Sequence, residues 1–374
     1  MIPRKILHLY SNHKWTGPAD HALNLTAWLQ QSDGIETVFA CGRRRGVENH
    51  LYRKARQRRL DCLNGLALQK HLSWRMFPDM YALKKMVNHS RIDLIHCHQD
   101  NDALTAVLAG FGDRMIRTCY DGEPAPLNFR QRFFYRRVKK IMTASCRLQT
   151  HLAALLPDKD IQQVDIPVDP ELFRPLEKNA RLLAEFDLKA AAPLGGIVAR
   201  VQKHRNFSLL LDAIEQVVRL IPDFKFLIVG RGTHIDTVTR QPVRQRGLQK
   251  NIIFTGYRHD DYRDVLNLLD YKIFLVPGSD GSCRAAREAL ACGTPVIAAR
   301  RGILPELITD GQTGILVEED PADLARAIIT MLEDNDFRQR CSRAARQYAE
   351  TVLSPDRYVR KVTAAYESLM SEVR

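Results

Sequence analysis

The sequence lacks a long uninterrupted apolar run. Its apolar stretches are short, such as IFLV at 273–276, whereas a membrane-spanning helix needs about 20 consecutive apolar residues. The N-terminal stretch MIPRKILHLY passes directly into a strand-like pattern, without the apolar segment and the small-residue cleavage site of a signal peptide. Both absences predict a protein that resides in the cytoplasm and has no membrane span.

Closely spaced cysteines are lacking as well. The eight cysteines lie far apart and include no C-x-x-C pair, which argues against a zinc site and against a disulfide framework. Cys97 and Cys292 lie within apolar stretches, where free thiols behave as small hydrophobic side chains. We therefore expect reduced, mostly buried thiols, as in a reducing cytosol, and no metal.

No compositionally biased tract is present either. The 374 residues are 45% hydrophobic and 26% charged, which is ordinary for a globular protein. This length exceeds the size at which one hydrophobic core stops growing, so two domains are expected.

The net charge of +13 is distributed unevenly. Residues 1–170 contain 26 Lys and Arg against 16 Asp and Glu, whereas residues 171–374 contain 30 against 27. A basic first half predicts an anionic partner, such as phospholipid head groups, phosphorylated glycolipids or nucleic acid. A solvated basic face without a specific partner is the alternative.

Short apolar runs alternate with longer helical patterns along the whole chain, which predicts parallel α/β layers. The series restarts near residue 193, after a proline-containing stretch at 165–176. We therefore predict two Rossmann-like domains, at 1–170 and 171–355, and a final helix over 356–374 that packs on its own domain or returns to the first. The predicted strands are 5–10, 37–42, 93–98, 115–120 and 140–145, followed by 195–200, 224–230, 251–256, 271–278, 294–299 and 314–317.

The most informative stretch is PGSDGSCRAAREALACGTPVIA at 277–298. A strand ends at Gly278, a small-residue loop follows, and a helix begins near Ser282 or Cys283. The amides of Gly281, Ser282 and Cys283, together with the helix dipole, predict an anion site suited to a diphosphate. Arg284 lies in the first turn of that helix, where a bound anion would favour it.

Two carboxylates flank this anion site. Glu288 follows Asp280 by eight residues, so both side chains can face one cleft from a loop and a helix. A carboxylate such as that of Glu288 can accept two hydrogen bonds from a ribose diol.

A cationic segment precedes this anion site in the sequence. ARVQKHRNFSLLLDA at 199–213 places Arg200 at the end of a strand and Arg205 at the start of a helix. Two guanidinium groups at this spacing can clamp a pyrophosphate. Two surface arginines without a ligand are the alternative.

These stretches resemble the retaining glycosyltransferases of family 4, which have the GT-B fold. Glu288 matches the second glutamate of their E-x7-E signature, which implies ribose binding, and the EALACGTPV run follows it. Asp280 stands where the family has the first glutamate, which contacts the donor sugar. Arg205 stands where the family usually has the lysine of its G-R-x4-K motif. Both departures preserve charge.

Other segments resemble the same family. FKFLIVGRGTH at 224–234 is similar to its L-x-I-V-G-x-G turn, and VDPELFRP at 168–175 is similar to its interdomain tract. NIIFTGYRHDD at 251–261 is similar to the segment whose loop packs on the nucleobase. Gly17 matches one glycine of the G-G-A-E loop, while the neighbouring proline lacks an N–H donor. Tyr120 stands where the family often has a histidine that touches the donor sugar, and Asp121 adjoins it. The expected catalytic residues are Asp280, Arg200, Arg205, Tyr120 and Asp121, and the expected donor-binding residues are Glu288, Gly281, Ser282, Cys283, Arg284, Gly232, Gly256, Tyr257, Arg258 and Gly17.

Three features of the first half keep alternatives open. His96 and His98 alternate on a predicted strand, but no third metal ligand is evident, so we favour a cleft-lining or polar-core role. NFRQRFFYRRVKK at 128–140 interleaves cations with aromatics, which suits either an anionic membrane surface or a helix packed on the sheet with solvated arginines. CGRRRG at 41–46 suits an anionic acceptor or a solvated loop.

The resemblance implies an N-terminal acceptor domain and a C-terminal donor domain that face each other across a cleft. It further implies transfer of a sugar from a nucleoside diphosphate sugar to a glycan or lipid-linked acceptor, with retention and without a metal or other cofactor. The setting would be cell-envelope polysaccharide, lipopolysaccharide or glycolipid synthesis, in the cytoplasm or on the inner face of the plasma membrane. The alternatives are a sugar-nucleotide epimerase and a degenerate sugar-nucleotide-binding protein. Nucleic acid is not an expected partner, because no nucleic-acid-binding module is recognisable.

Overall fold

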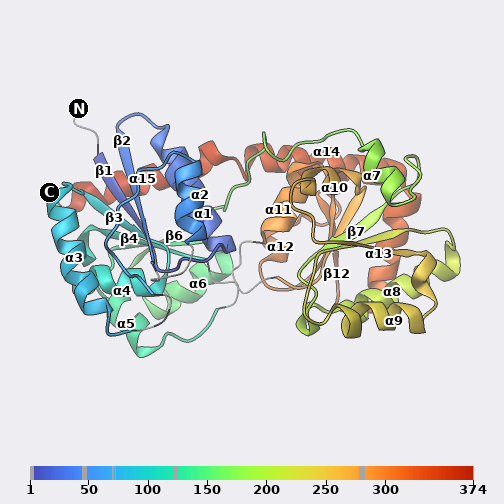
Figure 1. Ribbon diagram of the computed structural model, residues 1–374, viewed down its shortest axis with the longest axis horizontal. Coiled ribbons are helices and arrows are strands. Elements are labelled where there is room, and N and C mark those ends of the chain that lie inside the picture. The colour runs from blue at the N-terminus through green and yellow to red at the C-terminus, as the bar shows by residue number, and fades with distance from the viewer. Residues whose placement is uncertain are drawn as a thin grey trace. The chain divides into compact units, whose positions relative to one another are not determined.

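The computed structural model describes residues 4–43, 49–69, 71, 73–120, 124–277 and 283–373. The chain divides into two compact units (Figure 1). The first contains the described residues up to Ile166 and those from Pro355 onward, and the second contains those from Pro167 to Ser354. Each unit is described by itself below.

The first unit contains a six-stranded parallel sheet in the order β2-β1-β3-β4-β5-β6. Each of the five strands predicted in the first half is present. The sixth strand, β6, has the polar sequence DIQQ and lies at the edge of the sheet. It was not predicted, because it contains no apolar run. The strands are β1 (Arg4–Tyr10), β2 (Ile35–Cys41), β3 (Leu94–Cys97), β4 (Met115–Cys119), β5 (Lys140–Thr143) and β6 (Asp160–Gln163).

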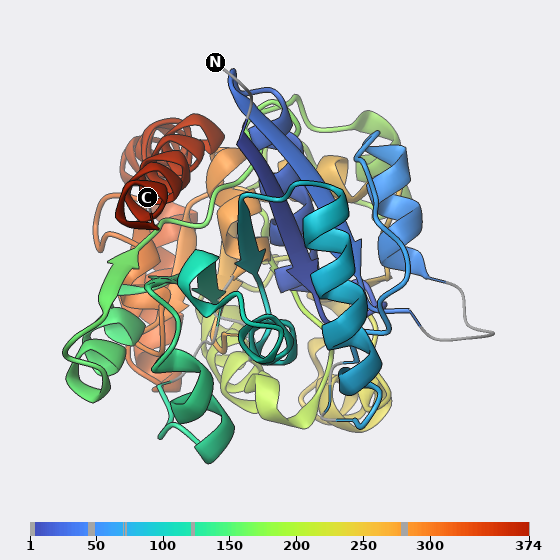
Figure 2. The same cartoon turned by 90° about the vertical axis from the view of Figure 1, so that its left-hand side faces the viewer.

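Helices cover both faces of this sheet. Successive strand residues point to opposite faces, so alternate residues pack with different helices. Ile6, Ile116 and their neighbours of the same parity pack with α1 (Gly17–Gln30) and α15 (Pro355–Val373). Leu7, Ile95 and the alternate residues pack with the helices on the other side, among which α3 crosses in front of β1 and β2 in Figure 2. These helices are α3 (Met76–His89), α4 (Asp100–Leu108), α5 (Phe129–Tyr135) and α6 (Cys146–Leu155). Helix α2 (His50–Gln57) lies against the β2 edge of the sheet. The short turn η1 spans Gly112–Arg114.

The second unit contains another six-stranded parallel sheet, in the order β12-β11-β10-β7-β8-β9. This order, counted from β7, is that of a dinucleotide-binding sheet. All six predicted strands are present: β7 (Gly195–Val198), β8 (Phe226–Val229), β9 (Ile252–Gly256), β10 (Tyr271–Phe274), β11 (Val296–Ala299) and β12 (Gly314–Val317).

Helices cover this second sheet. The largest core lies under α8 and α13, whose apolar residues recur at helical spacing, and a second core lies under α11 and α14. The helices are α7 (Ala180–Glu185), α8 (Phe207–Leu220), α9 (Gln241–Gln245), α10 (Tyr262–Leu268), α11 (Arg284–Ala291), α12 (Leu304–Leu307), α13 (Pro321–Glu333) and α14 (Asn335–Thr351), with short turns η2 (Lys203–Arg205), η3 (Asp236–Arg240) and η4 (Leu248–Lys250).

The two parallel sheets confirm the predicted α/β class. Among the described residues, none of the helices combines the length and the apolar character that crossing a bilayer would require.

Candidate functional site

The site of the second unit is positioned by its strand order. After β7 the chain turns toward β8 on one side, and after β10 it turns toward β11 on the other. Ligands bind beyond the carboxyl ends of parallel strands at such a switch point. Arg200 follows β7, and the segment that leads to α11 follows β10. The fold therefore brings the two predicted phosphate-binding elements to one edge of the sheet.

Arg205 joins these two elements directly. It ends the turn η2, and its Nη1 donates a hydrogen bond to the carbonyl oxygen of Val276, 2.7 Å away, just beyond β10. Arg200 is exposed at the same edge. The guanidinium groups of both residues thus lie on segments that border the switch point.

The glycine turn after β8 also packs against this edge. A Cβ atom at Gly232 would lie 1.8 Å from the carbonyl oxygen of Val201, and one at Gly230 would lie 2.1 Å from that of Ala199. Gly230 in addition has a φ of +141°, which disfavours other residues. The close approach that the sequence predicted for Gly232 is an approach to the chain that follows β7.

Helix α11 begins at Arg284, and Cys283 caps it in the left-handed conformation with a φ of +42°. Such a conformation in a residue other than glycine occurs mainly where surrounding structure enforces it, often at functional sites. Cys283 is buried. The predicted site residues Asp280, Gly281 and Ser282 lie outside the described residues.

Glu288 is buried one turn into α11. The Tyr262 hydroxyl donates a hydrogen bond to its Oε2 at 2.7 Å, and Nε of Arg284 lies 3.3 Å from its Oε1. Both carboxylate oxygens therefore have a donor nearby. Burial, with the negative charge of Glu288 as a further cause, raises the pKa of Tyr262 well above its usual value, so the phenol stays protonated and donates.

Lys272 is a buried cation beside α11 that the sequence analysis missed. It is fully buried on β10, and its Nζ donates a hydrogen bond to the carbonyl oxygen of Ala285 in the first turn of α11. Burial lowers the pKa of Lys272 to about 8, although the negative charge of Glu288 acts in the opposite direction. A lysine inside the apolar run YKIFLV was the signal that could have found it.

The predicted nucleobase loop divides into two parts. Tyr257 is 57% exposed, and the guanidinium of Arg231 lies 4.5 Å from its ring centroid. Arg258 instead donates to Glu185 at 2.7 Å and to Asp261 at 3.0 Å, so it ties α7 to the start of α10. Gly256 has a φ of +72° and its carbonyl accepts the N–H of Gly230.

The predicted site residues of the first unit are Gly17, Tyr120 and Asp121. Gly17 is the first residue of α1, whose N-terminus is capped by Thr16 through a hydrogen bond to the N–H of Ala19. Tyr120 is buried after β4, and its hydroxyl lies 2.9 Å from Nδ1 of His98. Asp121 and residues 44–46 of the predicted CGRRRG loop lie outside the described residues.

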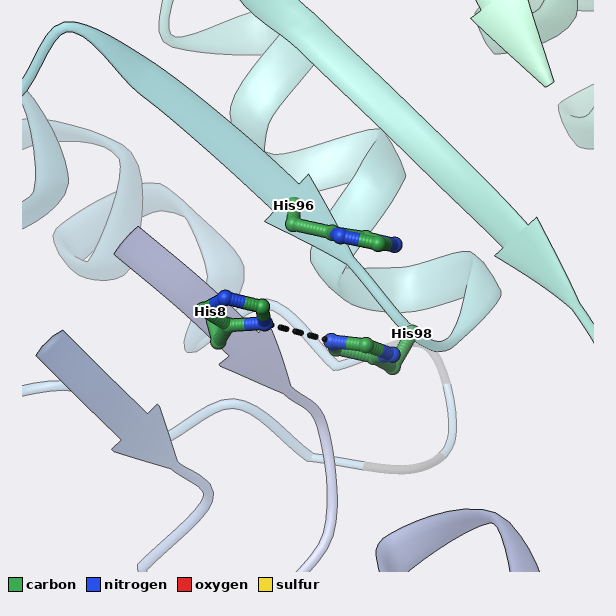
Figure 3. A group of neighbouring side chains, drawn as sticks. All are labelled: His8, His96 and His98. Carbon is green, nitrogen blue, oxygen red and sulfur yellow. Dashed lines mark hydrogen bonds between the residues drawn. The ribbon is translucent and has the colours of Figure 1, made fainter. Parts of the chain in front are cut away.

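A layer of three buried imidazoles lies on β1 and at the end of β3 (Figure 3), on the face of the sheet where His96 bonds to Tyr366 of α15. His8 on β1 joins His96 and His98, and one ring nitrogen from each lies within 4.8 Å of the others. The sequence analysis did not associate His8 with His96 and His98. His8 follows the buried Ile6 by two residues on β1 and therefore points to the same side of the sheet. His96 and His98 were expected to line a cleft or to lie in a polar core, and the structure places both of them in the core together with His8.

The geometry of this layer is that of a hydrogen-bonded network. His96 bonds to the hydroxyls of Tyr366 and Thr118, each at 2.6 Å, and Nδ1 of His8 lies 3.0 Å from Nε2 of His98. The rings of His96 and His98 stack with an interplanar angle of 12°. Five of the six ring nitrogens have hydrogen-bond partners, so we interpret this layer as a polar network within the core.

Two family descriptions match this chain. Residues 15–172 match Glycosyltransferase Family 4, and residues 185–348 match Glycosyl transferases group 1. The chain belongs to the family 4 glycosyltransferases. This confirms the family that the motifs around Glu288 and Arg205 indicated.

The relatives of this glycosyltransferase match it over different fractions of its length. The lipopolysaccharide core biosynthesis mannosyltransferase LpsB of Rhizobium meliloti is 27% identical over 82% of this chain and 88% of its own length. The D-inositol 3-phosphate glycosyltransferase of Corynebacterium kroppenstedtii is 32% identical, but the match spans 50% of this chain and 42% of that protein. Anabaena HepE, whose crystal structure contains UDP, has a TM-score of 0.81 at 18% identity over 97% of this chain and 100% of HepE. The structural likeness confirms the predicted GT-B class of fold.

Replacing Lys272 by methionine is expected to destabilise the second unit by about 1.5–3 kcal/mol, because a buried charged hydrogen bond to α11 is lost. Urea unfolding of the full chain measures this change. Lys225→Met is the matched control, because Lys225 also donates to a backbone carbonyl, that of Lys250, but at an exposed position. Equal losses in the two variants would contradict a special role of Lys272 in holding α11.

Proposed function

We propose that this glycosyltransferase moves a sugar from a nucleoside diphosphate sugar to an acceptor hydroxyl, with retention of the anomeric configuration and without a metal or other cofactor. The observation that carries the proposal is the edge of the second sheet where Arg205 bonds to the end of β10 beside α11, with Glu288 buried in that helix. Guanidinium groups and a helix N-terminus are suited to a diphosphate, and a carboxylate is suited to a ribose diol.

In the proposed reaction the bond between the anomeric carbon and the diphosphate oxygen breaks, and a bond to the acceptor oxygen forms on the same face. The acceptor proton passes to the leaving phosphate oxygen. Arg200, Arg205 and the amides at 281–284 would stabilise the charge that develops on the diphosphate, which is an electrostatic form of catalysis. Asp280, Tyr120 and Asp121 remain the residues proposed to contact the donor sugar.

The relatives support the choice of substrates. The HepE structure contains UDP, and LpsB is named for the lipopolysaccharide core. We therefore propose a nucleotide-sugar donor and a glycan or lipid-linked acceptor in envelope synthesis, with the protein on the inner face of the plasma membrane. The exposed arginines of the basic segment 128–140 suit an anionic surface there.

A non-catalytic sugar-nucleotide-binding protein is the second candidate. Two observations favour it: Asp280 replaces the family's glutamate, and Tyr120 is buried against His98 rather than exposed. Such a protein would bind the nucleotide through the second unit and would not release it from a sugar.

Thermal unfolding with a panel of nucleoside diphosphates and their sugars, in the absence of metal, tests both candidates. A ligand at 100 times its Kd stabilises by about 2.7 kcal/mol, so we expect the Tm to rise by about 5–10 °C for one nucleoside series. Release of that nucleoside diphosphate in the presence of acceptor supports transfer. Binding without release with any acceptor supports the second candidate, and no shift with any nucleotide contradicts the site.

A further inference from the structure

Helix α3 presents a stripe of exposed aromatic side chains. Trp74, Phe77 and Tyr81 are 83%, 65% and 76% exposed. Their spacing of three and four residues places them on one side of the helix and of the turn that precedes it. The opposite side, with Asp79, Leu83 and Val87, is buried. The three rings therefore point away from the sheet of the first unit.

The same segment exposes charge of one sign. Asp79 is the only acidic residue between positions 71 and 91, and it is buried, where it accepts the N–H groups of Ala67 and Leu68 at 2.7 and 2.9 Å. The exposed charges of this segment are the cations Arg75, Lys84, Lys85 and Arg91. The outer face of α3 is thus aromatic in its first half and cationic in its second half.

Helix α5 also exposes an aromatic side chain and cations. Helix α4 packs against both α3 and α5. Phe129 of α5 is 84% exposed, and no acidic residue occurs from 124 to 139. Phe134 and Tyr135 are buried, while the arginines of α5 and its C-cap are exposed. We define the docking face as Trp74, Phe77, Tyr81, Lys84 and Lys85 of the α3 segment, without the side chains of α5.

A bilayer with anionic lipids fits this face better than the other possible occupants. Tryptophan and tyrosine favour the head-group region of membranes, where one end of the ring is apolar and the other is wet, and cations beside them attract anionic head groups. A single strand of nucleic acid is bound in a charged groove, whereas rings that are 65% or more exposed stand out from the surface. A second copy of the chain would bring equal cationic faces together.

We propose that the docking face binds an anionic bilayer, with the rings of Trp74, Phe77 and Tyr81 in the head-group region and Lys84 and Lys85 against the anionic lipids. The proposal deepens the membrane location that belongs to the proposed function, and it rests on that location but not on sugar transfer. It also assigns the membrane contact to α3, a segment outside the basic stretch 128–140. Because the rings supply apolar contact and the lysines supply charge, binding requires both.

Co-sedimentation of the full chain with vesicles tests the proposal. Vesicles of equal parts phosphatidylglycerol and phosphatidylcholine are compared with vesicles of phosphatidylcholine alone, at low and high salt. We expect binding to the anionic vesicles only, weakened by salt. The triple variant Trp74→Ala, Phe77→Ala, Tyr81→Ala is expected to bind at least tenfold more weakly, and so is Lys84→Glu, Lys85→Glu. Leu220→Ala, which removes an exposed apolar side chain of the second unit, is expected to bind as the unchanged chain does.

Several outcomes would overturn the proposal. Equal binding to both kinds of vesicle would remove the role of charge. Full binding by the triple aromatic variant, with loss in Arg130→Glu, Arg132→Glu, would assign docking to α5 instead. Light scattering that shows a dimer of the unchanged chain and a monomer of the triple variant would assign the face to a second copy. Loss of single-stranded DNA binding in the triple variant, with vesicle binding intact, would assign it to nucleic acid.

Discussion

Replacing Glu288 by alanine is expected to abolish sugar transfer and to weaken nucleoside diphosphate binding at least tenfold, while the chain stays folded. The proposed ribose hydrogen bonds go to a charged acceptor, and each such bond contributes about 1.5–3 kcal/mol. The substitution also removes the acceptor of the Tyr262 hydroxyl, so we expect the second unit to lose about 1–3 kcal/mol of stability. Titration calorimetry with the diphosphate, kcat/KM and circular dichroism measure these three effects.

Two further variants separate binding from stability. Tyr262→Phe removes the hydroxyl that bonds to Glu288 but leaves the carboxylate, so it should lower stability and retain measurable transfer. Glu333→Ala removes an exposed carboxylate at the end of α13 and should change none of the three quantities. Turnover of Glu288→Ala at the rate of the unchanged chain would refute the assignment of the donor site to α11.

The second large effect is a loss of folding stability at acidic pH, caused by the three buried histidines. Burial lowers the pKa of His8 to about 3 and places those of His96 and His98 well below their usual value. Below pH 6.5 the unfolded chain therefore binds protons that the folded chain does not bind. Stability is fully present above pH 6.5 and falls as the pH decreases toward 3. For His8 alone the loss between pH 7 and pH 5 amounts to about 2 kcal/mol.

His8→Asn isolates this contribution. The asparagine amide can occupy the place of the Nδ1 atom that bonds to His98, but it does not titrate. We expect the variant to lose about 2 kcal/mol less than the unchanged chain between pH 7 and pH 5, as measured by urea unfolding at each pH. Burial raises the pKa of Asp102 to about 7, which acts in the opposite direction, but Asp102 is common to both proteins and cancels in the difference. His234→Asn, at an exposed site, should leave the pH dependence unchanged, and parallel curves for His8→Asn would contradict the prediction.

The fold was largely predictable because its strands are buried on both faces. Continuous apolar runs such as those of β8 and β10 mark such strands, and helical spacing marks α8 and α15. The edge strand β6 was missed because it pairs with a neighbour on one side only and has a polar sequence, so it lacks the apolar run of a central strand. Its place is fixed by pairing with β5 rather than by its own composition.

The candidate site was predictable at the level of segments and less so at the level of side chains. Motifs located the segments of Arg205 and Glu288, and the strand order brings them to one edge. The bond of Arg205 to Val276, the pairing of Arg258 with Glu185 and the burial of Tyr120 depend on contacts distant in sequence. No local pattern encodes such contacts. Lys272 and His8 were missed because a polar residue in an apolar strand reveals its partner only after the neighbouring helix is placed.

The position of α15 has a consequence for the synthesis of the protein. Its side chains Tyr358, Val362 and Tyr366 complete the core that Ile6 begins, although the entire second unit lies between them in the chain. Domains generally fold as units in the order of translation, yet here α1 alone covers one face of the first sheet, and only in part, until α15 has left the ribosome. Throughout translation of the second unit, nascent chains must therefore carry an unfinished apolar surface, which makes that interval the period in which chaperones have most to protect.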